Sequence, residues 1–432
     1  MMLNSSASSA IWLDSQSTSN SFSAWIPVLW KQTTQSDFSL DILTHLDTQT
    51  SPGDVSLAFT PRLYAFGGGT NHFWRFDEST GSWITTLAQP TGNIQSGAAL
   101  VSDGKEFLYA LQGNSATFWR YNISANTWET RASTPLTIRS GGNLVFYNST
   151  SLYAFRGGGT ATFWSYNIVS NTWTRLSNAP DSITSDSAIC TDGAGHIYAL
   201  QGNNQVGFWR YSIVSNQWAA MQPTPQRTGS GNALAYDPYT KLIYALRGNN
   251  QHDFWYYDIT TNRWYATLSS TPARVNFGGS LVVASQNDLY AFRGGSTTTF
   301  WHYSIPQNRW TRDTATPMPG VRTGASLTAG PPAYVSNGEI DSLVLNTAQL
   351  DCKIRGVFWN ITTPANTAID VQIRASNSLM GAVPNSAWID LHQTSPAAAG
   401  LPFGQYIQWR VVLTSNDVNK TPVLREVRVY YT

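Results

Sequence analysis

A segment of about 45 residues recurs six times in this chain, and it restricts the possible fold more strongly than any other feature. Each copy contains a Phe-Trp pair, and the tryptophans of these pairs are Trp74, Trp119, Trp164, Trp209, Trp255 and Trp301. A second tryptophan follows nine residues later in every copy, and successive copies are 45 or 46 residues apart. A repeat of this length is typical of a supersecondary unit that buries its apolar faces only by stacking on neighbouring units.

Each copy predicts four short strands. In the third copy they read GGNLVFYN, SLYAFRG, TFWSYNI and TWTRL, and glycines 157–159 supply the positive-φ positions that a tight turn needs. A four-stranded unit of this size cannot bury both faces alone. Six units arranged radially can do so, because the large aromatic side chains fill the gaps between neighbouring sheets. The sequence therefore predicts an all-β fold with a six-bladed β-propeller.

The repeat resembles the kelch repeat over about residues 60 to 320. The similarity rests on an apolar strand, a glycine pair, and a Tyr followed seven residues later by a Trp, as in Tyr166 and Trp173. The Phe-Trp pair of the third strand departs from the kelch pattern, and three copies carry Asn114, Asn203 or Asn249 in place of the second Gly. The resemblance implies the propeller fold and leaves the function open, since propellers include enzymes, lectins and scaffolds.

The predicted propeller spans residues 56–329. RTGASLTAG, at 322–330, is similar to the first strand of the second copy, QSGAALVSD, and no second strand follows it. We therefore expect residues 323–329 to supply the innermost strand of blade one and to close the ring. The alternative is that residues 54–59 do so and that the later strand only caps the propeller.

Residues 330–432 predict a β-sandwich of about eight short strands separated by Pro, Gly and Asn. The endings YIQWRVVL and TPVLREVRVYY resemble a jelly-roll or discoidin-like module of large extracellular proteins of bacteria and archaea.

Residues 1–55 look like the front half of that same module. VLWKQTT, at 28–34, aligns with VFWNITT, at 357–363, and DFSLDI aligns with AIDVQI. Half a sandwich exposes an apolar face and open strand edges. We expect residues 1–55 either to dock on the C-terminal module of their own chain or to be completed by strand addition from another copy. Strand addition repeated head to tail would build a filament.

Composition restricts the partners. Charged residues are 12% of the chain and the formal net charge is +1, which disfavours nucleic acid and anionic membrane surfaces as partners. No apolar stretch is long enough to span a bilayer. Candidate N-glycosylation sites are Asn4, Asn122, Asn148, Asn360 and Asn419. We expect an extracellular or cell-surface protein.

The sequence predicts no catalytic, metal or cofactor site. The six histidines are scattered, and those that flank the Phe-Trp pairs lie in different blades at differing offsets, so they do not converge as metal ligands would. A kelch-fold copper-radical oxidase would need a Tyr-Cys crosslink and two His at the propeller mouth, and Cys190 has no such companions. We expect Cys190 and Cys352 to be two buried apolar residues, and a disulfide between them is the alternative.

One set of polar residues occupies equivalent positions in the predicted blades. The residues that end the second strand of blades two to six are Gln112, Arg156, Gln201, Arg247 and Arg293, with Gly67 in blade one. They would form a ring of donors around one mouth, suited to sugar hydroxyls, carboxylates or peptide carbonyls. The alternative is that they satisfy carbonyl groups of adjacent loops.

The function expected is that of a non-catalytic extracellular surface protein, either an adhesin or the repeating subunit of a filament. It would assemble with copies of itself through its terminal segments and display the propeller to glycans or surface proteins. A secreted lectin-like or glycan-active protein is the alternative.

Overall fold

The computed structural model describes residues 3–4, 28–44, 46–48, 54–78, 80–184, 187–331, 333–391, 395, 397 and 400–432. The chain divides into two compact units. The repeat unit is Pro61–Pro332, and the terminal unit combines Met1–Thr60 with Ala333–Thr432. The units thus meet within a few residues of the predicted boundaries at 55/56 and 329/330.

The repeat unit contains six four-stranded antiparallel sheets, which we number along the chain. Sheet 1 consists of β30 (Ser326–Ala329), β7 (Arg62–Phe66), β8 (Phe73–Asp77) and β9 (Ser82–Ile84). Sheet 2 consists of β10 (Ala99–Ser102), β11 (Phe107–Leu111), β12 (Phe118–Asn122) and β13 (Thr127–Thr130). Sheet 3 consists of β14 (Asn143–Asn148), β15 (Ser151–Phe155), β16 (Phe163–Asn167) and β17 (Thr172–Arg175).

The other three sheets repeat this order. Sheet 4 consists of β18 (Ala188–Thr191), β19 (His196–Leu200), β20 (Phe208–Ser212) and β21 (Gln217–Ala220). Sheet 5 consists of β22 (Ala233–Asp237), β23 (Leu242–Leu246), β24 (Phe254–Asp258) and β25 (Arg263–Tyr265). Sheet 6 consists of β26 (Ser280–Val283), β27 (Asp288–Phe292), β28 (Phe300–Ser304) and β29 (Arg309–Arg312).

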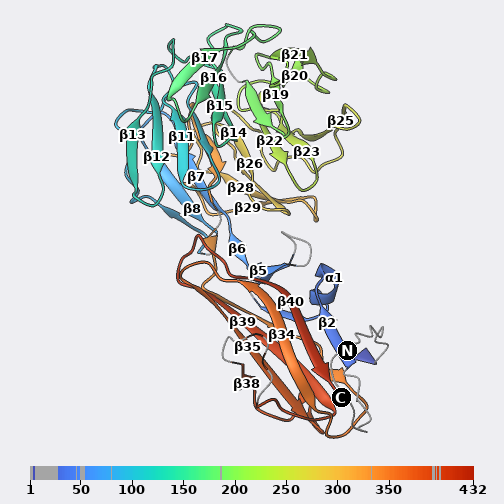
Figure 1. The fold of residues 1–432 in the computed structure, drawn as a ribbon. Helices are drawn as coiled ribbons and strands as arrows, with labels where there is room; N and C mark the ends of the chain where they lie inside the picture. Colours follow the sequence, from blue (N-terminus) through green and yellow to red (C-terminus); the bar gives the residue numbers. More distant parts are fainter. Residues whose placement is uncertain are drawn as a thin grey trace. The chain divides into compact units, whose positions relative to one another are not determined.

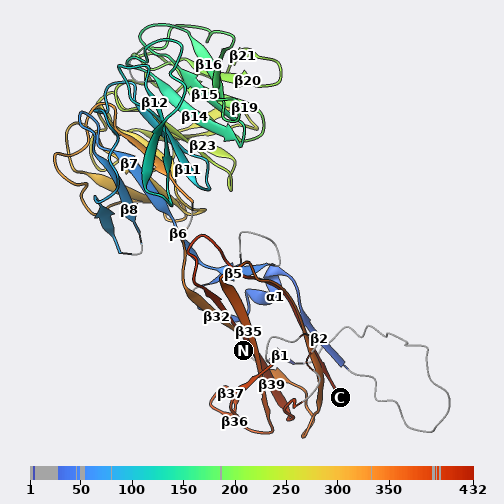
Figure 2. The same cartoon turned by 60° about the vertical axis from the view of Figure 1, so that its left-hand side comes forward.

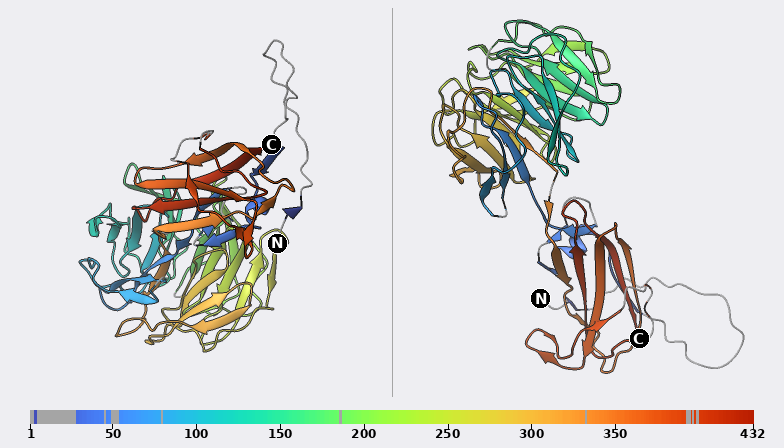
Figure 3. Two further views of the ribbon diagram at one scale, coloured as in Figure 1. Left: turned by 90° about the horizontal axis from the view of Figure 1, so that it is seen from below. Right: turned by 90° about the vertical axis from the view of Figure 1, so that its left-hand side faces the viewer.

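The first strands of these sheets lie next to one another in sequence order, and β26 contacts β30, so the sheets close into a ring (Figures 1 and 3). Hydroxyl groups tie neighbouring strands together. Ser280 Oγ accepts the Leu327 amide and Ser326 Oγ accepts the Leu100 amide, each at 3.1 Å. The repeat unit is therefore a β-propeller.

The innermost strand of sheet 1 comes from the end of the repeat unit. β30 pairs with β7 in antiparallel register, from Ser326 opposite Phe66 to Ala329 opposite Leu63. The other candidate segment, β5 (Val55–Leu57), pairs instead with strands of the terminal unit. The closing strand is thus the one whose sequence matches the start of the second copy.

Aromatic rings fill the junctions between sheets, as the repeat predicted. Phe73 of sheet 1 meets Tyr121 and Trp128 of sheet 2 edge to face, with ring centroids 4.8 and 5.0 Å apart. Equivalent contacts recur around the ring, including Phe300 of sheet 6 with Phe76 and Trp83 of sheet 1 at 5.0 and 5.1 Å. Such pairs add specific geometry to the large apolar area that they bury.

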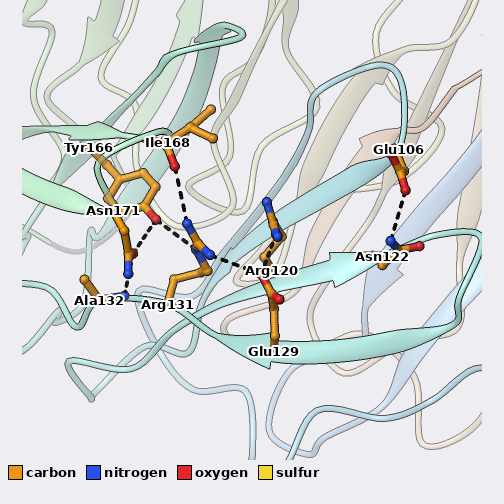
Figure 4. Close-up of polar contacts among 9 residues, drawn as sticks. All are labelled: Glu106, Arg120, Asn122, Glu129, Arg131, Ala132, Tyr166, Ile168 and Asn171. Carbon is orange, nitrogen blue, oxygen red and sulfur yellow. Dashed lines mark hydrogen bonds and ion pairs between the residues drawn. The ribbon is translucent and has the colours of Figure 1, made fainter.

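A polar clamp accompanies the aromatic contacts at five junctions. In Figure 4, Asn171 Oδ1 accepts the amide of Ala132 at 2.9 Å and the hydroxyl of Tyr166 at 2.7 Å. Trp173 Nε1 donates to the Ala132 carbonyl at 2.8 Å. The other clamp asparagines are Asn126, Asn216, Asn262 and Asn308. At each of these five junctions, one residue that follows the outermost strand of a sheet is thereby held at both its N–H and its C=O by the next sheet.

The junction between sheets 6 and 1 lacks this clamp. Phe76 and Gly81 stand where the other copies have the clamp Tyr and Asn. Trp83 still donates to the carbonyl of Thr314, at 3.3 Å, and the Thr314 hydroxyl donates to the Gly81 carbonyl at 2.6 Å.

The terminal unit contains two main sheets around one hydrophobic core (Figure 2). One sheet consists of β1 (Leu3–Asn4), β33 (Leu345–Asn346), β39 (Tyr406–Ser415), β32 (Asn337–Asp341), β3 (Ile42–Thr44), β35 (Thr367–Ser376) and β38 (Ile389–Asp390). The other consists of β2 (Val28–Gln32), β40 (Val423–Tyr431), β5, β4 (Leu46–Asp47) and β34 (Ile354–Thr362). Two further pairs are β6 (Phe59–Thr60) with β31 (Ala333–Tyr334) and β36 (Leu379–Met380) with β37 (Val383–Pro384).

Strands from both ends of the chain build this core. β2 and β34, whose sequences are similar, lie on opposite edges of β40, with Trp30 and Val357 both opposite Val429. The side chain of Phe38 is fully buried, and its ring meets the edge of Trp409 at 6.5 Å. The N-terminal strands described by the structure thus pair within their own chain.

DFSLDI, at 37–42, is similar in sequence to AIDVQI of the C-terminal module but differs from it in structure. Gln35–Phe38 form a short helix, α1, and only Ile42–Thr44 form a strand, β3. The helix begins here because the Asp37 carboxylate accepts the amides of Thr33 and Thr34 at 2.9 and 2.8 Å. Although partial burial opposes it, these hydrogen bonds hold the pKa of Asp37 below its usual value.

Candidate functional site

The predicted ring residues occupy one equivalent position in five sheets, directly after the second strand. Four of them donate a hydrogen bond to a carbonyl of the loop that leads into the innermost strand of their own sheet. The pairs are Gln112–Asn93 (3.2 Å), Arg156–Thr137 (3.3 Å), Arg247–Arg227 (3.0 Å) and Arg293–Arg274 (3.2 Å). Gln201 donates to the carboxylate of Asp181 instead, at 2.9 Å.

The alternative interpretation of this set, that it satisfies loop carbonyls, therefore describes its main contacts. Each arginine nevertheless has five N–H groups. Among the residues that the structure describes, Arg156 and Arg293 each use one of them, and Arg247 also pairs with Asp253 at 2.8 Å. The ring residues are half-buried, so the remaining donors stay at the mouth of the propeller.

A second set of arginines lies on the same face, and the sequence analysis missed it. Arg139, Arg227, Arg274 and Arg322 belong to the loops that approach the innermost strands, and all four are exposed. Backbone hydrogen bonds join these loops to the loops after the second strands. For example, the Ile183 amide donates to the Thr160 carbonyl at 3.0 Å, and the Ile183 carbonyl accepts the Gly159 amide at 2.9 Å. Aligning the copies on the apolar residue before each innermost strand would have revealed these arginines.

A cavity of about 350 Å³ lies at the centre of the ring, lined by the six innermost strands. Every described residue that lines it is uncharged, and the polar groups are the side chains of Ser, Thr, Asn, Tyr236 and Cys190 together with the backbone. Some of these groups are already engaged, as when Asn143 donates to the Ser187 carbonyl at 2.7 Å. The lining groups can accept and donate hydrogen bonds, and none of the described lining residues carries a carboxylate, imidazole or amine.

The cysteines are free thiols in the structure and both are buried. Cys190 lines the cavity in sheet 4, and burial raises its pKa. Burial also raises the pKa of Cys352 in the terminal unit. A raised pKa leaves little reactive thiolate at neutral pH, so neither thiol suits nucleophilic chemistry.

The strongest cluster of titratable side chains lies at the junction between sheets 6 and 1. Tyr290 donates to Glu78 Oε1 at 2.6 Å, and His302 Nε2 lies 2.6 Å from Asp288 Oδ1. Burial raises the pKa of Glu78, and the hydrogen bond that the Asp288 carboxylate accepts raises the pKa of His302. Within the described residues, no three His, Cys, Asp or Glu side chains form a group that could hold a metal ion. His45 and His392 lie outside those residues.

Three of the candidate glycosylation sites are open to solvent. Asn148, Asn360 and Asn419 are exposed. The amide of Asn122 is half-buried and donates to Glu106 at 3.1 Å, as Figure 4 shows, so a glycan there would break that bond. The side chain of Asn4 lies outside the described residues.

Comparison with known proteins supports a β-propeller-type fold. No protein-family model matches the sequence, and no curated protein matches it. The chain is similar to a solved structure titled "Crystal structure of Nidogen/Laminin Complex", with a TM-score of 0.50 and 13% identity over 62% of this chain and 98% of that one. The matched neighbour is a β-propeller-type protein. Among the described residues, no helix is long and apolar enough to cross a bilayer.

Proposed function

We propose that this chain is a non-catalytic extracellular surface protein, an adhesin or the repeating subunit of a cell-surface filament, whose propeller is displayed for binding. One observation carries the proposal. The propeller face combines guanidinium, amide and hydroxyl donors around a cavity whose described lining residues are all uncharged. Such a surface offers many hydrogen bonds and little acid–base chemistry.

The proposal includes a finer description of the fold. Each of the six sheets would be a blade of a kelch-like propeller, and the terminal unit a discoidin-like or jelly-roll-like β-sandwich. Supporting it are the six equivalent sheets and the two sheets that share one core.

Assembly with further copies would proceed by strand exchange. β2 occupies one edge of β40, from Val28 opposite Tyr431 to Gln32 opposite Val427. An identical β2 from another copy makes the same contacts, so exchange of the N-terminal segment creates an assembly without a new interface. Open exchange would give a filament, and reciprocal exchange a dimer.

The extracellular location is part of the proposal. The Ser-, Thr- and Asn-rich composition and the exposed sequons at Asn148, Asn360 and Asn419 favour it. Electron microscopy of the purified chain at micromolar concentration tests the assembly. Long ordered particles support a filament subunit, whereas monodisperse particles of one chain at every concentration contradict it.

A secreted carbohydrate-binding or glycan-active protein is the second candidate, favoured by the ring of Gln112, Arg156, Gln201, Arg247 and Arg293. A glycan array, followed by titration of any hit, tests it. The matched variant is R156Q/R247Q/R293Q, because Gln occupies this position naturally in sheets 2 and 4 and keeps the loop contact in sheet 2. Unchanged affinity in this variant would exclude the ring from binding.

A further inference from the structure

The loops around one mouth of the propeller contain more positively than negatively charged residues. We call this surface the arginine face and define it by two sets of loops. The loops after the second strands are 67–72, 112–117, 156–162, 201–207, 247–253 and 293–299, and the loops approaching the innermost strands are 93–98, 137–142, 181–187, 226–232, 273–279 and 320–325. Together they contain seven Arg and three Asp, and no Lys or Glu.

Most of this positive charge is not neutralised. Asp253 pairs with Arg247, Asp181 accepts a hydrogen bond from Gln201, and Asp186 lies outside the described residues. In the described part of the chain, the other six arginines of the face form no ion pair; they are Arg139, Arg156, Arg227, Arg274, Arg293 and Arg322. Uncompensated guanidinium groups at the mouth of a cavity attract anions.

The side-chain stems of two of these arginines, Arg139 and Arg322, pack against glycines of the facing loops. A Cβ placed on Gly158 would lie 2.6 Å from Cδ of Arg139, and one on Gly69 would lie 3.1 Å from Cδ of Arg322. Both glycines have positive φ, 67° and 70°. The aliphatic stems of the arginines thus lie on glycine backbone, which directs the guanidinium groups and reduces their freedom before any ligand arrives.

At this pair of loop positions, both arginines face a glycine, whereas Gly295 of sheet 6 faces the shorter Asn276, whose Cβ would lie 3.5 Å from an added Cβ. In sheet 2 the same two positions are Gln95 and Asn114, and their side-chain amides meet at 3.4 Å. Where the approach loop carries the longer Arg, the facing loop residue is Gly. This matching of sizes is expected if the arginine stem has to fit against that loop.

The remaining groups of the face indicate the class of anion. The loops after the second strands read GGGTNH, QGNSAT, RGGGTAT, QGNNQVG, RGNNQHD and RGGSTTT, and none contains an aromatic side chain other than His. Amide and hydroxyl groups suit the many hydroxyls of a sugar chain, and the guanidinium groups suit its acidic substituents. We infer that the arginine face binds an acidic polysaccharide bearing carboxylate or sulfate groups, with Arg139 and Arg322 as its principal contacts.

This inference rests on the proposed display of the propeller for binding, and calorimetric titration of the full chain tests it separately. The probes are polygalacturonate, dextran sulfate and uncharged dextran, with poly-glutamate and duplex DNA as other polyanions. We expect binding to one or both acidic polysaccharides, weakened by added salt, and none to dextran. The preferred probe separates carboxylate from sulfate recognition.

The variant R139Q/R322Q removes both charges and introduces the residue that sheet 2 carries naturally at Gln95. Each lost guanidinium contact should weaken binding roughly tenfold. The matched control R175Q/R312Q removes two exposed arginines from the outermost strands β17 and β29 and should change affinity less than about twofold.

Three results would overturn the inference: no binding to either acidic polysaccharide, equal losses in the two variants, or tighter binding of poly-glutamate or DNA. A protein that fails here but assembles, or binds an uncharged glycan, leaves the proposed function intact.

Discussion

The junction between sheets 6 and 1 should be the least stable of the propeller, because it contains a carboxyl group where the others contain an aliphatic side chain. Glu78 follows the third strand of sheet 1 at the position of Ile123, Ile168, Ile213, Ile259 and Ile305 in the other copies. Those isoleucines pack against the inter-sheet cores. Glu78 instead accepts the hydroxyl of Tyr290, a side chain that is 2% exposed.

The charges around Glu78 set the direction of the pH dependence. Burial raises the pKa of Glu78, and the nearby carboxylates of Asp288 and Asp313 raise it further. The hydrogen bond with Asp288 raises the pKa of His302. Both groups therefore bind protons more tightly in the folded protein, and the stability they contribute is lost as pH rises through their folded pKa values.

The substitution pair Glu78→Ile and Tyr290→Phe restores the apolar contact and removes both partners of the hydrogen bond. Burying an isoleucine side chain contributes roughly 1.5 to 3 kcal/mol, and the lost hydrogen bond costs about 0.5 to 1.5 kcal/mol net. We expect a gain of about 1 kcal/mol at neutral pH, which corresponds to about 2 to 4 °C in Tm for a unit of this size. Glu78→Ile alone should gain less, because it leaves the buried Tyr290 hydroxyl without its partner.

Differential scanning calorimetry at pH 5 and pH 8 measures both effects. The wild type should lose more stability between these values than the double variant does. Glu78→Gln, which keeps a neutral acceptor for Tyr290, should also flatten the dependence. The reverse change, Ile123→Glu, places a carboxyl at an ordinary junction and should destabilise the unit. A double variant less stable than the wild type at both pH values would refute this account.

Three further outcomes are expected. Asn171→Ala removes the clamp on Ala132 and should cost about 1 to 3 kcal/mol in urea denaturation, since it leaves a buried amide and hydroxyl without an acceptor; an unchanged midpoint would show that the clamp is not needed. Burial raises the pKa of Asp41 to about 7, so the terminal unit should lose stability as pH rises towards and through 7, and Asp41→Asn should abolish that loss in a thermal scan. Cys190 and Cys352 should resist a water-soluble thiol reagent in the native protein and react after unfolding, because both are buried; rapid native labelling would contradict the structure.

Most of the propeller could be predicted from the sequence because the copies of the repeat share one pattern of strands, turns and aromatic residues. The spacing of the tryptophans indicated the length and number of the copies, the turn residues within each copy indicated four strands, and the likeness of 322–330 to 95–103 located the closing strand. Local signals of this kind need no knowledge of distant contacts. The packing of Phe73 on Tyr121 and Trp128 follows from the same periodicity.

The candidate site was harder to predict because its residues are defined by loops rather than by periodicity. The ring residues lie directly after the second strands, but their hydrogen bonds to carbonyls 19 or 20 residues upstream depend on loop geometry that the sequence does not display. Arg139 and Arg322 each follow the apolar residue of the approach loop, but the sequence does not show that their side-chain stems lie on Gly158 and Gly69, which distinguishes them from other exposed arginines. Glu78 was overlooked for the opposite reason, because it stands where a strongly regular repeat breaks.

The apparent half-module at the N-terminus has a topological explanation that leads to a last prediction. β7 begins where β30 ends, and the Gly330 amide donates to the Arg62 carbonyl at 2.7 Å, so the chain enters and leaves the propeller at neighbouring points. Just outside it, β6 and β31 pair antiparallel, with Thr60 opposite Ala333. Residues 28–60 and 333–432 thus form one module that the propeller interrupts.

Replacing residues 61–332 by Asn-Gly should therefore leave a folded terminal unit, because a two-residue turn joins two paired antiparallel strands without strain. Phe59 and Tyr334, whose rings lie 6.3 Å apart, would stabilise that hairpin. We expect a cooperative thermal transition and dispersed amide resonances. As a control, removing residues 1–60 as well takes Phe38, Val55 and Leu57 out of the core and should abolish cooperative folding. If the shorter chain folds equally well, the N-terminal strands are an appendage and not part of the module.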